Sequence, residues 1–291
     1  MWPPITYSIS SVEQVPKLVR QLKANRVDMI KAYGGLSVPM MWALAADGRK
    51  QSLRVLVDQS WRNGSPELVA GGISAFAHTP DFIFGGDEGI SLLKGRGVTI
   101  ISTLSVVEAK ARRRLQNLAF LDEPLIRDTT PPDVLADVRA SKPSDAWERG
   151  PRQENEKRFR QQQQNLKRLF DAGIVFVAGT DAPYPGVFQG EGIHHELELL
   201  VEAGLTPLQA ITAATANAAK LVGAGDEWGT LEPGRLANLL VVNGRPDRAV
   251  CDTRKIEMVF VRGRQLDRVR LRYDAATDPG FRPLAAVAAS R

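Results

Sequence analysis

Five polar residues, four of them ionisable, stand at or just past the ends of short apolar runs that predict β-strands. They are Lys31, Asp58, His78, Thr103 and Asp181. Carboxylate and imidazole groups bind divalent metals, and both transfer protons during hydrolysis. Taken singly, each residue also has a structural explanation: an exposed lysine, a histidine with a partner, or an aspartate that caps a helix. Four ionisable groups at the ends of different strands favour a shared site.

Short apolar runs alternate with helical patterns along most of the chain. The runs are 27–31, 53–58, 73–78, 98–103 and 174–178. This alternation predicts βα units with parallel strands, and therefore an α/β fold class with a parallel sheet or a TIM-type (β/α)8 barrel. The carboxyl ends of the strands converge on one mouth of such a barrel, which would bring the five polar residues together. The Pro-, Asp- and Arg-rich stretch 122–151 is interpreted as a loop-helix insertion on the rim.

The part of the chain after residue 205 has a different pattern. Thr206, Pro207 and Gln209 form a capping-box arrangement that predicts the start of a helix. Two apolar runs, 236–242 and 256–261, predict strands separated by a turn. We therefore expect a small β-layer beside the main domain. The predicted domains are a barrel part over 1–228, a β-layer over 229–270 and a tail over 271–291.

Four motifs follow one another in the second half of the chain. They are Gly179–Ala182, His194–Leu200, Ala203–Pro207 with the alanines after it, and Gly229–Asn238. In type and order they resemble the amidohydrolase superfamily, in its imidazolonepropionase-like and prolidase-like branch. The resemblance runs from about residue 12 to residue 268. It implies that the strands are numbers four to eight of an incomplete barrel, and that the β-layer is part of a C-terminal β-sandwich.

The resemblance also implies roles for single residues. Lys31 is similar to the strand-four lysine that family members carboxylate to bridge two metals. His78 resembles the strand-six histidine ligand. Asp181 resembles the strand-eight aspartate, which binds metal and takes a proton from the bridging water. A bound metal lowers the pKa of that water toward about 7, so hydroxide becomes available at neutral pH.

The chain departs from the family pattern at two places. Asp58 stands where the family has the strand-five histidine ligand, and it is the remaining candidate metal residue. The strand-one His-x-His pair is missing from the sequence, which holds three histidines. His194 and His195 cannot replace that pair, because adjacent helical residues do not face the same way. We predict substrate binding by His194, His195 and Thr103, while a packing role for the two histidines stays open.

The functional prediction is a metal-dependent hydrolase that cleaves non-peptide or dipeptide C–N bonds with a metal-activated water. A small molecule is the expected substrate, and one or two divalent ions, zinc first, are the expected cofactors. Five of eight barrel strands would leave two open edges, so we expect an N-terminally truncated chain. The alternative is a catalytically inactive fragment, a pseudoenzyme or a subunit that a partner chain completes.

The composition excludes several other classes of protein. The net charge is +5 and the sequence pI is about 9.4, but the basic clusters 110–114 and 149–168 lack interleaved aromatic residues. They predict solvated helix faces and no nucleic-acid binding. Cys251 is the only cysteine, and no apolar run is long enough to span a membrane. A homo-oligomer is possible. The compartment is unknown; the cytoplasm is the default expectation, and a signal peptide could lie in a longer N-terminus.

Overall fold

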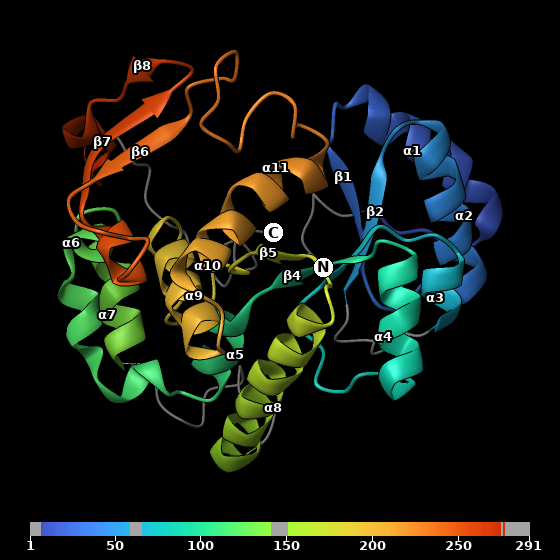
Figure 1. Cartoon of the computed structure of the whole chain (residues 1–291), viewed down its shortest axis with the longest axis horizontal. Helices are drawn as coiled ribbons and strands as arrows, with labels where there is room; N and C mark the ends of the chain where they lie inside the picture. The colour runs from blue at the N-terminus through green and yellow to red at the C-terminus, as the bar shows by residue number, and fades with distance from the viewer. Residues whose placement is uncertain (1–6, 59–65, 141–150, 275, 277–291) are drawn as a thin grey trace, which may run out of the picture.

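A parallel sheet of five strands forms the centre of the computed structural model, which describes residues 7–58, 66–140, 151–274 and 276 (Figure 1). The strands, in the order β1-β2-β3-β4-β5, are β1 Met29–Ala32, β2 Arg54–Asp58, β3 Ala75–Ala77, β4 Thr99–Ser102 and β5 Phe176–Ala178. Asp58 pairs with Ala77 and Ser102 pairs with Ala178, so the carboxyl ends lie at one edge of the sheet. All five predicted strands are confirmed, each somewhat shorter than its apolar run.

Helices connect the strands and cover the sheet. They are α1 Val15–Ala24, α2 Val38–Lys50, α3 Pro66–Ala70, α4 Gly86–Gly95, α5 Leu104–Lys110, α6 Pro124–Arg127, α7 Pro132–Ala140, α8 Arg152–Asp171, α9 Glu191–Glu202, α10 Pro207–Ala214 and α11 Ala216–Val222. Short 3-10 turns are η1 Val12–Gln14, η3 Arg114–Gln116, η4 Leu118–Asp122, η5 Val250–Arg254 and η6 Arg268–Leu271. The capping box at Thr206 and Gln209 is present and starts α10 as predicted. No helix of the described residues is long and apolar enough to cross a membrane.

Two large groups of buried side chains hold the helices to the sheet. One joins β1 and β2 to α1, α2 and α3, with Val19, Met41 and Leu68 fully enclosed. The other joins β4 and β5 to α5, α8, α9 and α10, with Ile100 and Leu166 fully enclosed. Burial of a large aliphatic side chain contributes about 1.5–3 kcal/mol, so these groups fix the position of every strand end.

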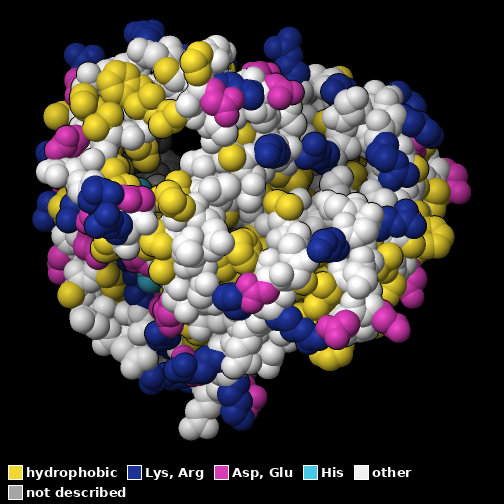
Figure 2. Space-filling model, viewed as in Figure 1, with side chains coloured by type: hydrophobic (Ala, Val, Ile, Leu, Met, Phe, Trp, Pro, Cys, Tyr) yellow, Lys and Arg dark blue, Asp and Glu magenta, His cyan; other side chains and the backbone are white. Residues whose placement is uncertain are grey.

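A small antiparallel sheet follows the helices and lies at the upper left of Figure 1, with α9 to α11 between it and α1 to α4. Its strands are β6 Leu239–Val242, β7 Ile256–Val261 and β8 Arg264–Gln265, in the order β6-β7-β8. Hydrophobic side chains gather over this sheet in Figure 2, and Leu240 and Val261 are half exposed.

The structure corrects two parts of the predicted architecture. The described residues form an open parallel sheet with β1 and β5 at its edges, so the closed barrel is not confirmed. The expected β-sandwich portion is only the three-stranded sheet, because no second layer of described strands packs on it. The predicted insertion contains α6 and α7, while its residues 141–150 lie outside the described residues, as does most of the tail. The division into domains stays a prediction.

Candidate active site at the carboxyl ends of the strands

Four of the five predicted residues form a chain of contacts at the carboxyl edge of the sheet. Lys31 Nζ lies 3.2 Å from Asp58 Oδ2, and His78 Nε2 lies 3.3 Å from the same oxygen. His78 Nδ1 lies 2.6 Å from the hydroxyl of Thr103. The chain of contacts therefore crosses β1, β2, β3 and the end of β4, in the order in which those strands are paired.

Lys31, Asp58, His78 and Thr103 are called the strand-end cluster below. Lys31 is a half-buried cation at one end of it. Burial lowers the pKa of Lys31, but a hydrogen bond with Tyr33 and the charge of Asp58 outweigh this and raise it. The charge of Asp181, the fifth predicted residue, makes a smaller contribution to the raised pKa of Lys31. The Lys31 ammonium also lies 4.5 Å from the centre of the Tyr33 ring, a cation–π distance.

The backbone is unusual at the two residues that carry the predicted chemistry. His78 and Asp181 have φ angles of 72° and 58°, in the left-handed region that side chains rarely adopt. Such conformations cost about 1–3 kcal/mol and persist where the surrounding structure imposes them. Asp58 is buried and Asp181 is exposed, so Asp181 is the carboxylate of the pair that solvent or a substrate can reach.

Glu196, which the sequence patterns did not single out, contacts the residues that follow Thr103. Glu196 of α9 is fully buried, and it accepts hydrogen bonds from Leu104 N–H at 2.9 Å and from Ser105 N–H at 2.7 Å. The hydroxyl of Ser102 donates to it as well. Burial raises the pKa of Glu196, and these hydrogen bonds only partly oppose that rise. The only sequence signal was a glutamate at a helix position whose neighbours are apolar.

The two adjacent histidines of α9 contact other parts of the protein. His194 Nδ1 lies 3.0 Å from the hydroxyl of Thr253, and burial lowers the pKa of this histidine. His195 lies between Glu108, 2.5 Å from its Nε2, and Glu198, 3.3 Å from its Nδ1. Burial lowers the pKa of His195, but the two carboxylates outweigh it and raise the pKa above its ordinary value. These contacts favour the packing role, and substrate binding by either histidine stays a prediction.

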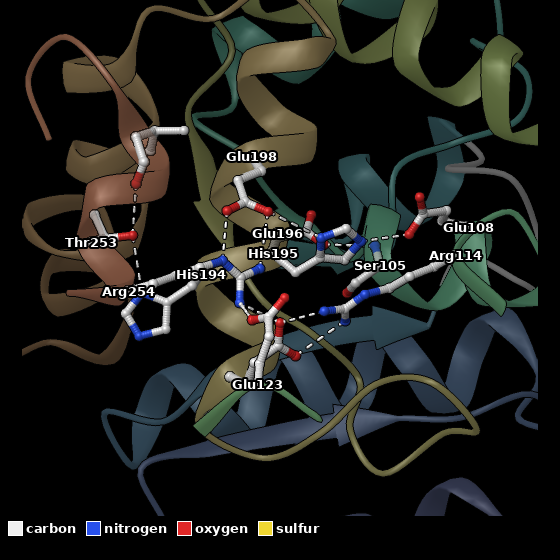
Figure 3. A network of polar contacts seen from close by, with 12 residues as sticks. Ser105, Glu108, Arg114, Glu123, His194, His195, Glu196, Glu198, Thr253 and Arg254 are labelled. Carbon is white, nitrogen blue, oxygen red and sulfur yellow. Dashed lines mark hydrogen bonds and ion pairs between the residues drawn. The ribbon is translucent and has the colours of Figure 1, made fainter. Parts of the chain in front are cut away.

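Figure 3 shows that the same helix face carries an ion-pair network. Arg254 donates to Glu198, to Glu123 and to the buried Glu191, with its Nη1 2.6 Å from Glu191 Oε1. Arg114 donates two hydrogen bonds to Glu191 from the other side. The expectation of a solvated basic face over 110–114 is therefore wrong for Arg114, which is 9% exposed and paired.

The arrangement of donors in the strand-end cluster does not complete a metal centre. Among residues 7–58, 66–140, 151–274 and 276, no group of three or more His, Cys, Asp and Glu side chains is placed to hold a metal ion. Asp58 contacts both Lys31 and His78, so its carboxylate is engaged with a cation and an imidazole. A carboxylated Lys31 would be an anion beside that carboxylate, whereas the contacts suit an ammonium group. The described residues thus fit part of a metal ligand set.

Comparisons with known proteins show what this chain is similar to in sequence and in fold. Residues 134–266 match the family model described as Amidohydrolase family. Imidazolonepropionase from Geobacillus kaustophilus (strain HTA426) is 37% identical over 80 residues, covering 27% of this chain and 19% of that protein. Adenine deaminase 3 from Rhizobium meliloti (strain 1021) is 35% identical over 105 residues, covering 35% of this chain and 17% of that protein.

A solved structure shows the same fold over most of the chain. The crystal structure of a Xaa-Pro dipeptidase with bound methionine in the active site superposes with a TM-score of 0.66 at 20% identity, covering 89% of this chain and 59% of that chain. Together these findings show that residues 134–266 are similar to the amidohydrolase family, and that the chain shares the fold of a solved dipeptidase structure. It spans less than two thirds of the length of these relatives.

Proposed function

We propose that this chain carries part of the active site of a hydrolase that cleaves C–N bonds of small molecules. This part lies at the carboxyl ends of the parallel strands. The observation that carries the proposal is the convergence of Lys31, Asp58, His78 and Thr103 at the carboxyl edge of the sheet, with the charge of Asp181 acting on Lys31. Carboxyl ends of parallel strands are where active sites form in folds of this kind. The relatives named above support the C–N chemistry.

The roles follow from exposure and charge. Asp181 is the exposed carboxylate, and we assign it as the base that accepts a proton from the attacking water and returns it to the leaving amine. Lys31 is an ammonium group that can bind an anionic or carbonyl oxygen of the substrate. His78 is held between Asp58 and Thr103, which fixes the plane of its imidazole. Thr103 would contact the substrate through the same hydroxyl.

We further propose that the hydrolysis depends on a divalent metal, with zinc as the first candidate. His78 and Asp181 are the described residues whose imidazole and carboxylate suit such an ion, with Asp58 as a third donor if it leaves Lys31. A bound metal would act as a Lewis acid toward water. The described donors form only part of a ligand set for such an ion.

The test is hydrolysis by the purified chain together with its metal content. Imidazolonepropionate, adenine and Xaa-Pro dipeptides would be incubated separately with the protein before and after chelation. The measured quantities would be consumption of imidazolonepropionate by ring opening, release of ammonia from adenine and release of proline from the dipeptides. We expect turnover of one substrate class, lost on chelation and restored by zinc. A folded, monodisperse protein that hydrolyses none of them, with or without added zinc, would overturn the proposal for this chain.

A second candidate is a non-catalytic or partner-completed product of the same ancestry. It is favoured by Asp58, which stands in the position of a family metal ligand and is paired with Lys31. The variant Asp58→His distinguishes the two candidates. If that substitution confers stoichiometric zinc binding on a protein that otherwise binds none, Asp58 is the change that removed the metal, and the second candidate is supported.

A further inference from the structure

The N-terminus of α5 contacts both the candidate site and helix α9. Thr103 is the N-cap residue of this helix, yet its side chain makes no capping hydrogen bond. A threonine at an N-cap ordinarily accepts a hydrogen bond from the first turn of its own helix. In this protein the first two N–H groups of α5, those of Leu104 and Ser105, donate to Glu196 of α9 instead. The Thr103 hydroxyl is thereby left to contact His78 Nδ1 at 2.6 Å.

The same segment also contacts the residue that precedes the proposed base. The hydroxyl of Ser105 donates to the backbone carbonyl of Thr180 over 3.2 Å. Thr180 is followed by Asp181, whose φ of 58° requires support from its surroundings. Ser105 is itself held by its N–H group, which donates to Glu196 over 2.7 Å. Residues 103–105 therefore reach His78 through one hydroxyl and the Asp181 loop through another.

We infer that Glu196 is a positioning residue for His78 and for Asp181 in the candidate site. It fixes the start of α5, and through Thr103 and Ser105 it sets the orientation of the His78 ring and of the Asp181 backbone. A buried carboxylate suits this purpose because it accepts several hydrogen bonds at once and is costly to leave unpaired. The catalytic meaning of this role rests on the function proposed above, whereas the positioning itself does not.

The test begins with Glu196→Gln, which keeps the shape of the side chain. A glutamine has one acceptor oxygen where the glutamate has two. Its NH2 group would therefore face a backbone N–H group from which it cannot accept a hydrogen bond. Glu202→Gln is the matched control, since Glu202 lies on the same helix but pairs with Arg113. Thr103→Val removes the hydroxyl that contacts His78. Ser105→Ala removes the hydroxyl that bonds Thr180 and interacts with Glu196, but it keeps the Ser105 N–H bond to Glu196.

The first readout is the ring nitrogens of histidine in 15N-labelled protein, which contains three histidines in all. We expect the His78 nitrogen shifts in Glu196→Gln to move toward those of Thr103→Val. They should stay unchanged in Glu202→Gln and in Ser105→Ala. A purely structural cap would lower the melting temperature of Glu196→Gln and leave the His78 ring nitrogens where they are in the wild type, and that result would overturn the inference.

The second readout is hydrolysis of the substrate found active above. Misplacement of catalytic groups by about 1 Å can cost about 10²-fold, so we expect Glu196→Gln to lower kcat by 10- to 100-fold with KM little changed. Ser105→Ala should lower kcat less, and the double variant should resemble Glu196→Gln alone. If no substrate is hydrolysed, the proposed function fails while the NMR result still decides the positioning.

A milder variant covers the case in which Glu196→Gln does not fold. Ser102→Ala removes one donor to Glu196 and leaves the other two in place. We expect a smaller shift of the His78 ring nitrogens in the same direction as that of Thr103→Val. Unchanged His78 shifts in a folded Ser102→Ala, together with unchanged kcat in Ser105→Ala, would contradict the inference.

Discussion

Asp181 combines exposure with a left-handed backbone, and this combination makes its substitution informative. Asparagine adopts positive φ angles several-fold more often than most residues, so Asp181→Asn preserves the backbone at φ 58° while removing the charge. We predict that this variant folds normally and loses hydrolysis by at least about 10²-fold, the contribution typical of a general base. Turnover and melting temperature would be measured beside Asp171→Asn, an exposed control paired with Lys167. Wild-type turnover in Asp181→Asn would disprove the role as base.

Asp58 is buried against two partners, and its charge therefore affects stability. Asp58→Asn leaves the Lys31 ammonium without its counter-charge, at a predicted cost of about 2 kcal/mol in the free energy of unfolding. This is less than the about 3–5 kcal/mol of a fully buried pair, because the Lys31 side chain is 29% exposed. Urea unfolding would be compared with the double variant Lys31→Met/Asp58→Asn. We expect the double variant to lose less than the sum of its parts, and strict additivity would show that the pair does not interact.

Single residues also show how far the sequence alone could lead. The meeting of Lys31, Asp58, His78 and Thr103 was predicted, because strand ends are local features and parallel pairing brings them together. Glu196 was not, since its role depends on α5, a helix that was not predicted. Residues 104–109 of α5 are all buried, so the segment lacks the polar face from which a 3.6-residue period is recognised.

At the scale of elements, α9 and η5 are joined through Glu198. Burial alone would raise the pKa of this carboxyl, but hydrogen bonds and charges from Arg254 and His195 outweigh it and hold the pKa at about 2. A depressed pKa stabilises the fold above the ordinary value of 4.5, and this stabilisation is lost as the pH falls through about 2. The contribution at neutral pH is on the order of 2–3 kcal/mol.

The corresponding prediction concerns Glu198→Gln. Its unfolding free energy should lie about 2 kcal/mol below that of the wild type at pH 7 and pH 5.5, and the gap should narrow as the pH falls below about 4.5. Urea titrations at pH 7, 5.5, 4 and 3 would measure this. Glu257→Gln, on an exposed position of β7, serves as the control. A gap that is constant from pH 7 to pH 3 would contradict the assigned pKa.

Helices and strands could largely be predicted where an apolar run was clear or where capping residues marked the start of a helix. The capped α10 and the five central strands appear where capping residues and apolar runs predicted them. Closure of the sheet and the second layer of the sandwich were not found, because both require pairing partners that the described residues do not contain. Register and closure are properties of the assembled sheet and leave no local signal.

At the scale of the whole molecule, Arg254 fastens the segment before β7 to the main part of the structure. The Arg254 side chain is 17% exposed, and its guanidinium contacts Glu191, whose side chain is fully enclosed. Arg254→Met should lower the free energy of unfolding by about 3 kcal/mol, because Glu191 keeps Arg114 alone as its counter-charge. The matched control is Arg245→Met, an exposed arginine paired with Asp247, which should cost less than about 0.5 kcal/mol.

Chemical denaturation followed by fluorescence would measure both variants. Far-UV circular dichroism would be recorded beside the summed fluorescence of the five tryptophans, and loss of coincidence between the two transitions would reveal separate unfolding of parts of the chain. Equal destabilisation by Arg254→Met and Arg245→Met would show that the network contributes nothing beyond a surface ion pair.

Helix α9 has a practical meaning for protein engineering. On one side it accepts the first turn of α5 through Glu196, and on another it holds η5 through Glu191 and Glu198. A chimera that takes its C-terminal sheet from a similar protein would therefore replace the partner of a helix that also supports the strand ends. Residues 191–202 and 250–254 should be exchanged together, as one cassette, whenever such chimeras or shuffled libraries are built.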